Sequence, residues 1–174
     1  MNLELFREMD REELLTYLGF LLREHRVVDA FWFLMVEEAY GREAAERLNE
    51  DVWERIAPMS VKDLRKYLHL KEKGLPGLEK ALKLFPWTSI GGHRITRKGN
   101  EVILTAPQCP PQVARVKRNL GEYHCKGMHQ RVFASIAREI DPRIHVTCDF
   151  APPDSHPEDL FCRWRFSMSE EGSL

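Results

Sequence analysis

The four cysteines of this sequence are the residues best suited to chemistry, and all of them lie in its last 66 residues. They are Cys109, Cys125, Cys148 and Cys162, separated by 15, 22 and 13 residues. A thiolate is a soft metal ligand and also the attacking form of a catalytic cysteine. No C-x-x-C pair is present, so the signature of a zinc ribbon or zinc finger is missing. The clustering of the cysteines indicates a shared site in this half of the chain. Their spacing does not show whether that site binds a metal or carries out catalysis.

The first hypothesis is a site that binds a small molecule or a transition metal such as zinc or iron. Cys125 and His129 are four residues apart, which places both on one face of a helix, one turn apart. Cys148 and Cys162 lie on the apolar faces of two predicted strands and approach each other if these strands form a hairpin. We therefore predict that Cys109, Cys125, His129, Cys148 and Cys162 surround one site and include the metal ligands.

The second hypothesis is a cysteine-assisted hydrolase that acts on a small C–N or C–S substrate. Cys109 precedes Pro110 and is predicted to be the N-cap of a helix, where the helix dipole lowers the pKa of a thiol. Cys109 would then be the nucleophile, and His124 or His156 would carry the proton, because imidazole transfers protons near neutral pH. The third hypothesis is a structural or partner-binding protein whose cysteines fill the core, as free cysteines commonly do.

Basic residues near the cysteines suggest the charge of a ligand. Arg115, Arg118 and Lys126 follow Cys109 closely in the sequence. Convergent basic side chains can hold a carboxylate or phosphate, although a solvated helix face has the same composition. We predict that these three residues bind a small anionic molecule. The whole chain has 26 basic and 27 acidic residues, so it lacks the strongly basic field that nucleic-acid binding requires.

The N-terminal half contains no cysteine and has one markedly apolar segment, "DAFWFLM", beginning at Asp29. This segment is apolar on all sides of a helix and therefore needs burial on several sides. The helical core, an apolar ligand pocket or a homodimer interface through the helical region would each provide it. The surrounding apolar stretch is too short to cross a bilayer, and the acidic start lacks the features of a signal peptide. We predict a cytoplasmic protein that does not bind membranes.

The order of predicted elements defines an α+β fold. Residues 1–85 are predicted to form a helical region, and residues 86–174 a cysteine-containing α+β domain. Within the first, Asp10 and Glu13 form a capping box, one helix is expected over 29–40, and another is expected to end before Pro58. Within the second, alternating apolar residues and turn signals give the order β-β-α-α-β-β. We expect a helical bundle packed on an antiparallel sheet with its helices on one face.

The C-terminal half also carries a resemblance. The segments "APQCPPQVARVKRNLGEYHCKGMH" and "IDPRIHVTCDFAPPDSHPEDLFCRWRF" resemble a cytosolic four-cysteine family of anaerobic bacteria and archaea whose function is not characterised. The closing pattern "C-D-F…C-R-W-R-F" is more distantly similar to L-2-amino-thiazoline-4-carboxylate hydrolase-like proteins and to the vinyl-reductase-type small-molecule-binding domain. These resemblances imply an α+β ligand-binding fold with thiols beside the pocket.

Overall fold

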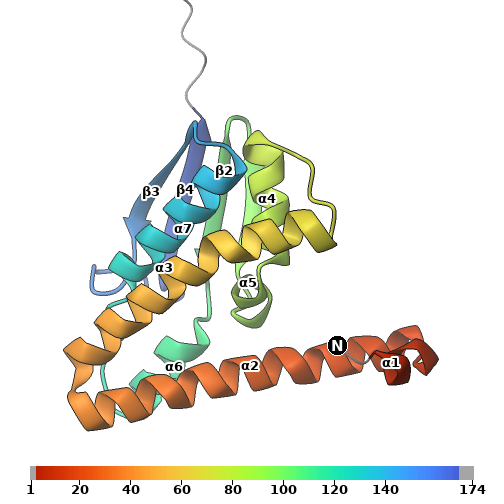
Figure 1. Ribbon diagram of the computed structural model, residues 1–174. Coiled ribbons are helices and arrows are strands. Elements are labelled where there is room, and N and C mark those ends of the chain that lie inside the picture. Colours follow the sequence, from red (N-terminus) through yellow and green to blue (C-terminus); the bar gives the residue numbers. More distant parts are fainter. Residues whose placement is uncertain (1–2, 169–174) are drawn as a thin grey trace, which may run out of the picture.

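Helices form the N-terminal half of the chain, and a four-stranded antiparallel sheet forms much of the C-terminal half (Figure 1). The computed structural model describes residues 3–168. The predicted α+β class is confirmed, and residues 94–168 have the predicted β-β-α-α-β-β order. A short helix at Pro86–Ile90, at the start of the predicted second half, was not predicted. The elements are α1 (Glu4–Glu8), α2 (Arg11–Tyr40), α3 (Arg42–Tyr67), α4 (Gly74–Leu84), α5 (Pro86–Ile90), β1 (Arg94–Lys98), β2 (Glu101–Ala106), α6 (Pro110–Lys117), α7 (Lys126–Ile140), β3 (Ile144–Phe150) and β4 (Cys162–Met168).

The sheet has the strand order β1-β2-β4-β3, so β2 and β4 are its central strands. Leu104 of β2 pairs with Trp164 of β4, and Trp164 pairs on its other side with Cys148 of β3. Alternate residues of β2 and β4 are buried, which is the pattern of a sheet with one face against a core. The helix α7 packs against the sheet through β3, and α3 packs against α7 (Figure 1).

The helix α2 is one uninterrupted element of 30 residues. Its predicted capping box is present, because Asp10 accepts a hydrogen bond from the Glu13 backbone and Glu13 accepts one from the Asp10 backbone. The prediction of a separate helix beginning near Asp29 is wrong. Residues 23–28 contain no glycine or proline that would end the helix, so it continues to Gly41. None of the residues of α2 is buried.

The helix α3 passes through Pro58, so the predicted end before that residue is also wrong. A proline inside a helix costs about 3 kcal/mol, because it removes one hydrogen bond and crowds the preceding turn. Trp53, Ala57 and Val61 are buried on both sides of the proline, in the core that α3 shares with α7. Tertiary packing therefore offsets the local cost and keeps the helix continuous.

A single buried cluster contains residues from both sides of residue 85. It includes Trp53 and Val61 of α3, Ile136 of α7, and Trp164 and Phe166 of β4. The division predicted at residues 85 and 86 remains a prediction, and the helical region and the sheet domain share this core. Among residues 3–168, no helix is long and apolar enough to span a membrane.

Candidate functional site

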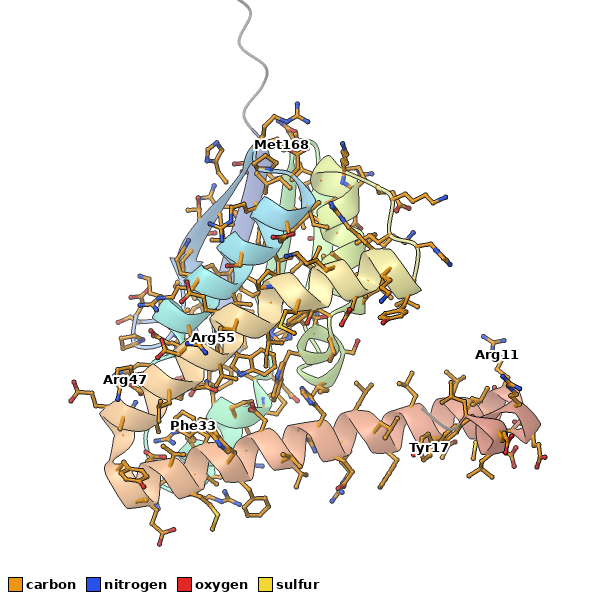
Figure 2. The ribbon with its side chains drawn as sticks, viewed as in Figure 1. Arg11, Tyr17, Phe33, Arg47, Arg55 and Met168 are labelled. Atoms are coloured by element: carbon orange, nitrogen blue, oxygen red, sulfur yellow. The ribbon has the colours of Figure 1, made fainter. Side chains whose placement is uncertain are left out.

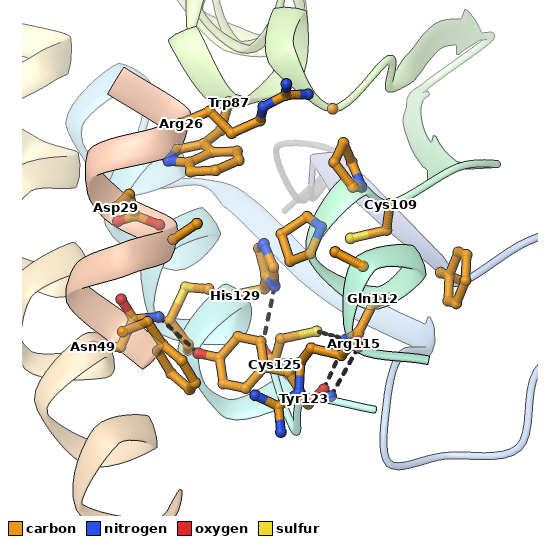
Figure 3. A pocket seen from close by; sticks show the side chains of 18 of the residues that line it. Arg26, Asp29, Asn49, Trp87, Cys109, Gln112, Arg115, Tyr123, Cys125 and His129 are labelled. Carbon is orange, nitrogen blue, oxygen red and sulfur yellow. Dashed lines mark hydrogen bonds between the residues drawn. The ribbon is translucent and has the colours of Figure 1, made fainter. Parts of the chain in front are cut away.

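A cavity of about 450 Å³ lies between α2, α3, α5, α6 and α7 (Figure 3). This volume falls within the range of about 300–1,000 Å³ that small-molecule pockets occupy. The lining is mostly apolar and strongly aromatic, and it includes Phe33, Trp53, Phe85, Met128, Val132 and Phe133. The space is therefore suited to an apolar ligand rather than to a strongly hydrated ion.

Three of the four cysteines line this cavity. Cys109 lies at the N-cap of α6, Cys125 at the N-cap of α7, and Cys162 at the start of β4. A charge on Cys109 or Cys162 would raise the pKa of Cys125 further, so the three thiols lie within electrostatic reach of one another. His129 lines the same cavity, whereas Cys148 is not among the lining residues. The structure thus brings together four of the five residues predicted to share a site.

The thiols are neutral near physiological pH. Burial raises the pKa of Cys109 to about 11 and that of Cys162 to about 12, and it also raises the pKa of Cys125. The predicted N-cap position of Cys109 is confirmed, but the lowered pKa expected there is wrong. Removal of the thiol from water by its apolar surroundings outweighs the dipole of the eight-residue helix α6. These thiols therefore behave as small apolar groups in the cavity wall.

No metal-binding group is present in the described part of the chain: no three His, Cys, Asp or Glu side chains are arranged to hold an ion. The cavity is lined by four of the predicted metal ligands, Cys109, Cys125, Cys162 and His129, but these residues do not form such a group. Zinc or iron at these residues stays a prediction.

A buried hydrogen-bond network holds the segment between α6 and α7 in place. The fully buried Gln112 donates a hydrogen bond to the backbone oxygen of Tyr123 at 2.7 Å and accepts one from its backbone nitrogen at 2.8 Å. Asn49 of α3 donates to the Tyr123 hydroxyl at 2.8 Å. Sequence reasoning missed these residues, because their partners are 11 and 74 positions apart and no local pattern connects them.

The ion pair between Arg115 of α6 and Glu37 of α2 connects the two helices beside the cavity. Its two hydrogen bonds measure 2.6 and 2.9 Å, and the Arg115 side chain is only 7% exposed. Lys126, also predicted to bind a ligand, pairs with Asp154 at 2.7 Å. Arg118 lines the cavity and, within residues 3–168, forms no ion pair. Anion binding by Arg115, Arg118 and Lys126 stays a prediction, with Arg118 the one whose charge is uncompensated.

The two histidines predicted to act in catalysis have other contacts. Nε2 of His156 lies 3.0 Å from a carboxylate oxygen of Glu122, and its Nδ1 lies 2.9 Å from the backbone oxygen of Pro157. His124 is exposed, with its Nδ1 3.9 Å from Glu46. Both ring nitrogens of His156 thus lie near acceptor oxygens of other groups. The catalytic roles of Cys109, His124 and His156 stay predictions.

Two buried polar atoms beside the cavity have no hydrogen-bond partner in the described structure. They are Nε1 of Trp87 and Nδ1 of His93. A buried polar atom without a partner costs free energy, so such atoms in a cavity wall are candidates for contact with a ligand. The sequence contained no signal for them, since "PWTSIGGH" matches no binding motif.

The neutral state of His129 makes stability depend on pH. Its Nδ1 lies 3.1 Å from the backbone oxygen of Cys125, and burial lowers the pKa of His129 to about 4. An unfolded histidine titrates near 6.5, so below that pH the unfolded state binds a proton that the folded state does not. We expect the free energy of unfolding to fall as the pH decreases from 7 to 4.5.

Urea denaturation at several pH values measures this effect. His129→Asn keeps a donor for the Cys125 carbonyl and removes the titrating ring, so its free energy of unfolding should depend less on pH. Equal slopes for the wild type and the variant would show that His129 does not titrate as described.

The fold and the site define an α+β protein with a partly open cavity that is mostly apolar and is bordered by three neutral thiols. The chain belongs to the family described as "Family of unknown function (DUF6125)", whose model matches residues 7–168. A comparison with curated proteins finds no match.

A comparison with solved structures finds one match with a TM-score of 0.48 and 10% sequence identity. It is a trafficking protein particle complex subunit 3 from Naegleria fowleri covalently bound to palmitic acid, and the match covers 83% of this chain and 97% of that one. The resemblance to L-2-amino-thiazoline-4-carboxylate hydrolase-like proteins and the anaerobic distribution receive no support from these comparisons and stay predictions. Since the family has no assigned function, the inference of function depends on the geometry of the site.

Proposed function

We propose that this protein binds a small, largely apolar molecule in the cavity between α2 and the rest of the fold. The observation that carries this proposal is a space of about 450 Å³ surrounded by aromatic and aliphatic side chains. A cavity of this size with an apolar wall is favourable for a ligand, because binding removes apolar surface from water on both sides.

The polar atoms of the wall suggest the chemistry of one end of the ligand. Trp87 Nε1 can only donate a hydrogen bond, so it favours a ligand with an acceptor such as a carbonyl or carboxylate oxygen. Arg118 supplies a positive charge at the lining. The proposed ligand is therefore an apolar molecule with one polar or anionic group, which agrees with the predicted small anionic molecule and gives it an apolar body.

A substitution that fills the cavity tests the proposal. Ala30 of α2 lines the cavity and is exposed, so Ala30→Trp places a large ring in the space without displacing a buried side chain. We expect this variant to bind an apolar fluorescent probe such as anilinonaphthalene sulfonate at least tenfold more weakly than the wild type. Ala39→Trp is the matched control, because Ala39 lies on the same helix, is exposed and does not line the cavity.

Probe titration at equal protein concentration measures the dissociation constant and the stoichiometry. Wild-type protein and Ala39→Trp should bind one probe molecule per chain with similar affinity. If Ala30→Trp binds the probe as tightly as they do, the cavity is not the binding site and the proposal fails.

A further inference from the structure

The exposed apolar side chains of this protein are concentrated on one helix. Among the large hydrophobic residues that are exposed in residues 3–168, most belong to α1 and α2 or the residues beside them. With 30 residues, α2 is about 45 Å long at about 1.5 Å per residue. Its N-terminal part projects beyond the sheet and the other helices, together with α1 (Figures 1 and 2). Monomeric proteins rarely expose a continuous apolar surface of this extent.

Six of these residues form a regular seam along α2. Leu14, Leu21, Val28 and Met35 recur every seven residues, and Leu18 and Trp32 lie between them at the alternate positions. Their exposed fractions range from 41% to 66%. This spacing of four and three residues is the heptad pattern of helices that pair along their length. We call these six residues the α2 seam.

A different part of α2 faces the body of the protein. Phe33 points from α2 toward the rest of the molecule, where its ring packs on Tyr123 at 5.0 Å between centroids (Figure 2). Glu37 binds Arg115 on the same side. His25, which occupies the remaining heptad position, lies at the border and packs near Trp53 and Trp87 of its own chain. The other elements of the chain therefore pack against the face of α2 that contains Phe33 and Glu37, and they leave the α2 seam exposed.

We propose that a second copy of this chain covers the α2 seam, with the two α2 helices antiparallel about a twofold axis near residues 26 and 27. In a twofold interface the same surface must match itself. This arrangement places Leu18 opposite Met35 and Leu21 opposite Trp32 of the second copy, so that apolar seam residues meet each other at both ends. This axis exchanges four of the six seam residues with one another, and this self-match favours a second copy over an unrelated partner.

The available area is sufficient for a stable dimer. Large apolar residues have roughly 180 Å² of accessible surface when fully exposed, so the six seam residues offer on the order of 550 Å² on each chain. Two copies would then bury roughly 1,100 Å² in total, which is above the total of about 1,000 Å² that a specific interface needs. The depletion of charge along the seam is also typical of the centre of an interface.

The mass of the full chain in solution tests the proposal. By analytical ultracentrifugation we expect the wild type to sediment as a dimer of two 20.4 kDa chains at micromolar concentration. Leu21→Glu should sediment as a monomer, with unchanged far-ultraviolet circular dichroism because Leu21 is 45% exposed. Met59→Glu is the matched control: Met59 is 62% exposed on the helix α3, outside the seam, and its variant should remain dimeric.

Disulfide cross-linking tests the orientation separately. In the variant Leu18→Cys/Met35→Cys, mild oxidation should join position 18 of one chain to position 35 of the other, whereas parallel helices would join like positions. A monomeric wild type, including one that sediments only with phospholipid vesicles, would overturn the proposal. So would a Leu21→Glu variant that stays dimeric, or a cross-link between like positions.

Discussion

Methionine in place of Arg115 is expected to lower the free energy of unfolding by about 2–3 kcal/mol. Removal of one partner from a buried ion pair leaves the other charge without compensation, at a cost of about 3–5 kcal/mol when both groups are fully buried. The Arg115 side chain is 7% exposed and that of Glu37 is 19% exposed, so partial contact with water reduces the cost. The change also removes the hydrogen bonds that Arg115 donates to the backbone oxygens of Leu120 and Gly121.

The sign of the pH dependence identifies the contribution of this pair. Hydrogen bonds from Arg115 hold the pKa of Glu37 below its ordinary value of 4.5. The stabilisation is therefore fully present above pH 4.5 and is lost as the pH falls through the lower folded pKa. The difference in unfolding free energy between the wild type and Arg115→Met should shrink in acid.

Urea denaturation at pH 7 and at successively lower pH measures both effects. Arg23→Met serves as the control, because Arg23 pairs with Glu24 on the exposed surface of the same helix α2, and such pairs contribute about 0–1 kcal/mol. If Arg115→Met costs no more than Arg23→Met, the connection between α2 and α6 does not depend on this ion pair.

Alanine in place of Trp164 is expected to have the largest effect of all, a loss of about 3–5 kcal/mol in the free energy of unfolding. Trp164 is 0% exposed on the central strand β4, and its ring meets that of Phe133 at 5.2 Å between centroids. Deletion of the ring removes its buried apolar area and leaves a void that the sheet and α7 cannot close without strain.

Thermal and urea denaturation provide the measurement. Trp164→Phe should lose less, because it keeps an aromatic ring in the contact with Phe133. Tyr67→Ala is the control for loss of an aromatic side chain, since Tyr67 is 61% exposed at the end of α3 and should change the unfolding free energy by less than about 1 kcal/mol. A Trp164→Ala variant as stable as Tyr67→Ala would show that this region of the core is not closely packed.

The strands were predictable because their signal is local. In β4 the buried residues Cys162, Trp164 and Phe166 alternate with Arg163 and Arg165, and this period of two is visible in the sequence. The same holds for the capping box of α2, which needs only residues three positions apart. Predictions succeeded where the pattern and the structure involve the same few neighbouring residues.

Helix continuity was less predictable. Pro58 is a strong local signal for a helix end, yet α3 continues because Trp53, Ala57 and Val61 pack in a core that includes residues more than seventy positions away. The packing of a long apolar helix face contributes more to stability than the local helix propensity of one residue. The residues against which that face packs cannot be recognised from the sequence.

By itself the sequence determined the α+β class, the order of the strands and helices from residue 94 onward, and the location of all four cysteines in the second half. Only the tertiary structure decided that three of these thiols border one apolar cavity, that their pKa values rise, and that Arg115 is engaged by Glu37. The physical reason is one of range. The periodicity of a helix or strand can be recognised from neighbouring residues in the sequence. Desolvation and charge pairing depend on groups that are distant in the sequence. Glu37 and Arg115, for example, are 78 positions apart and come into contact only in the folded protein.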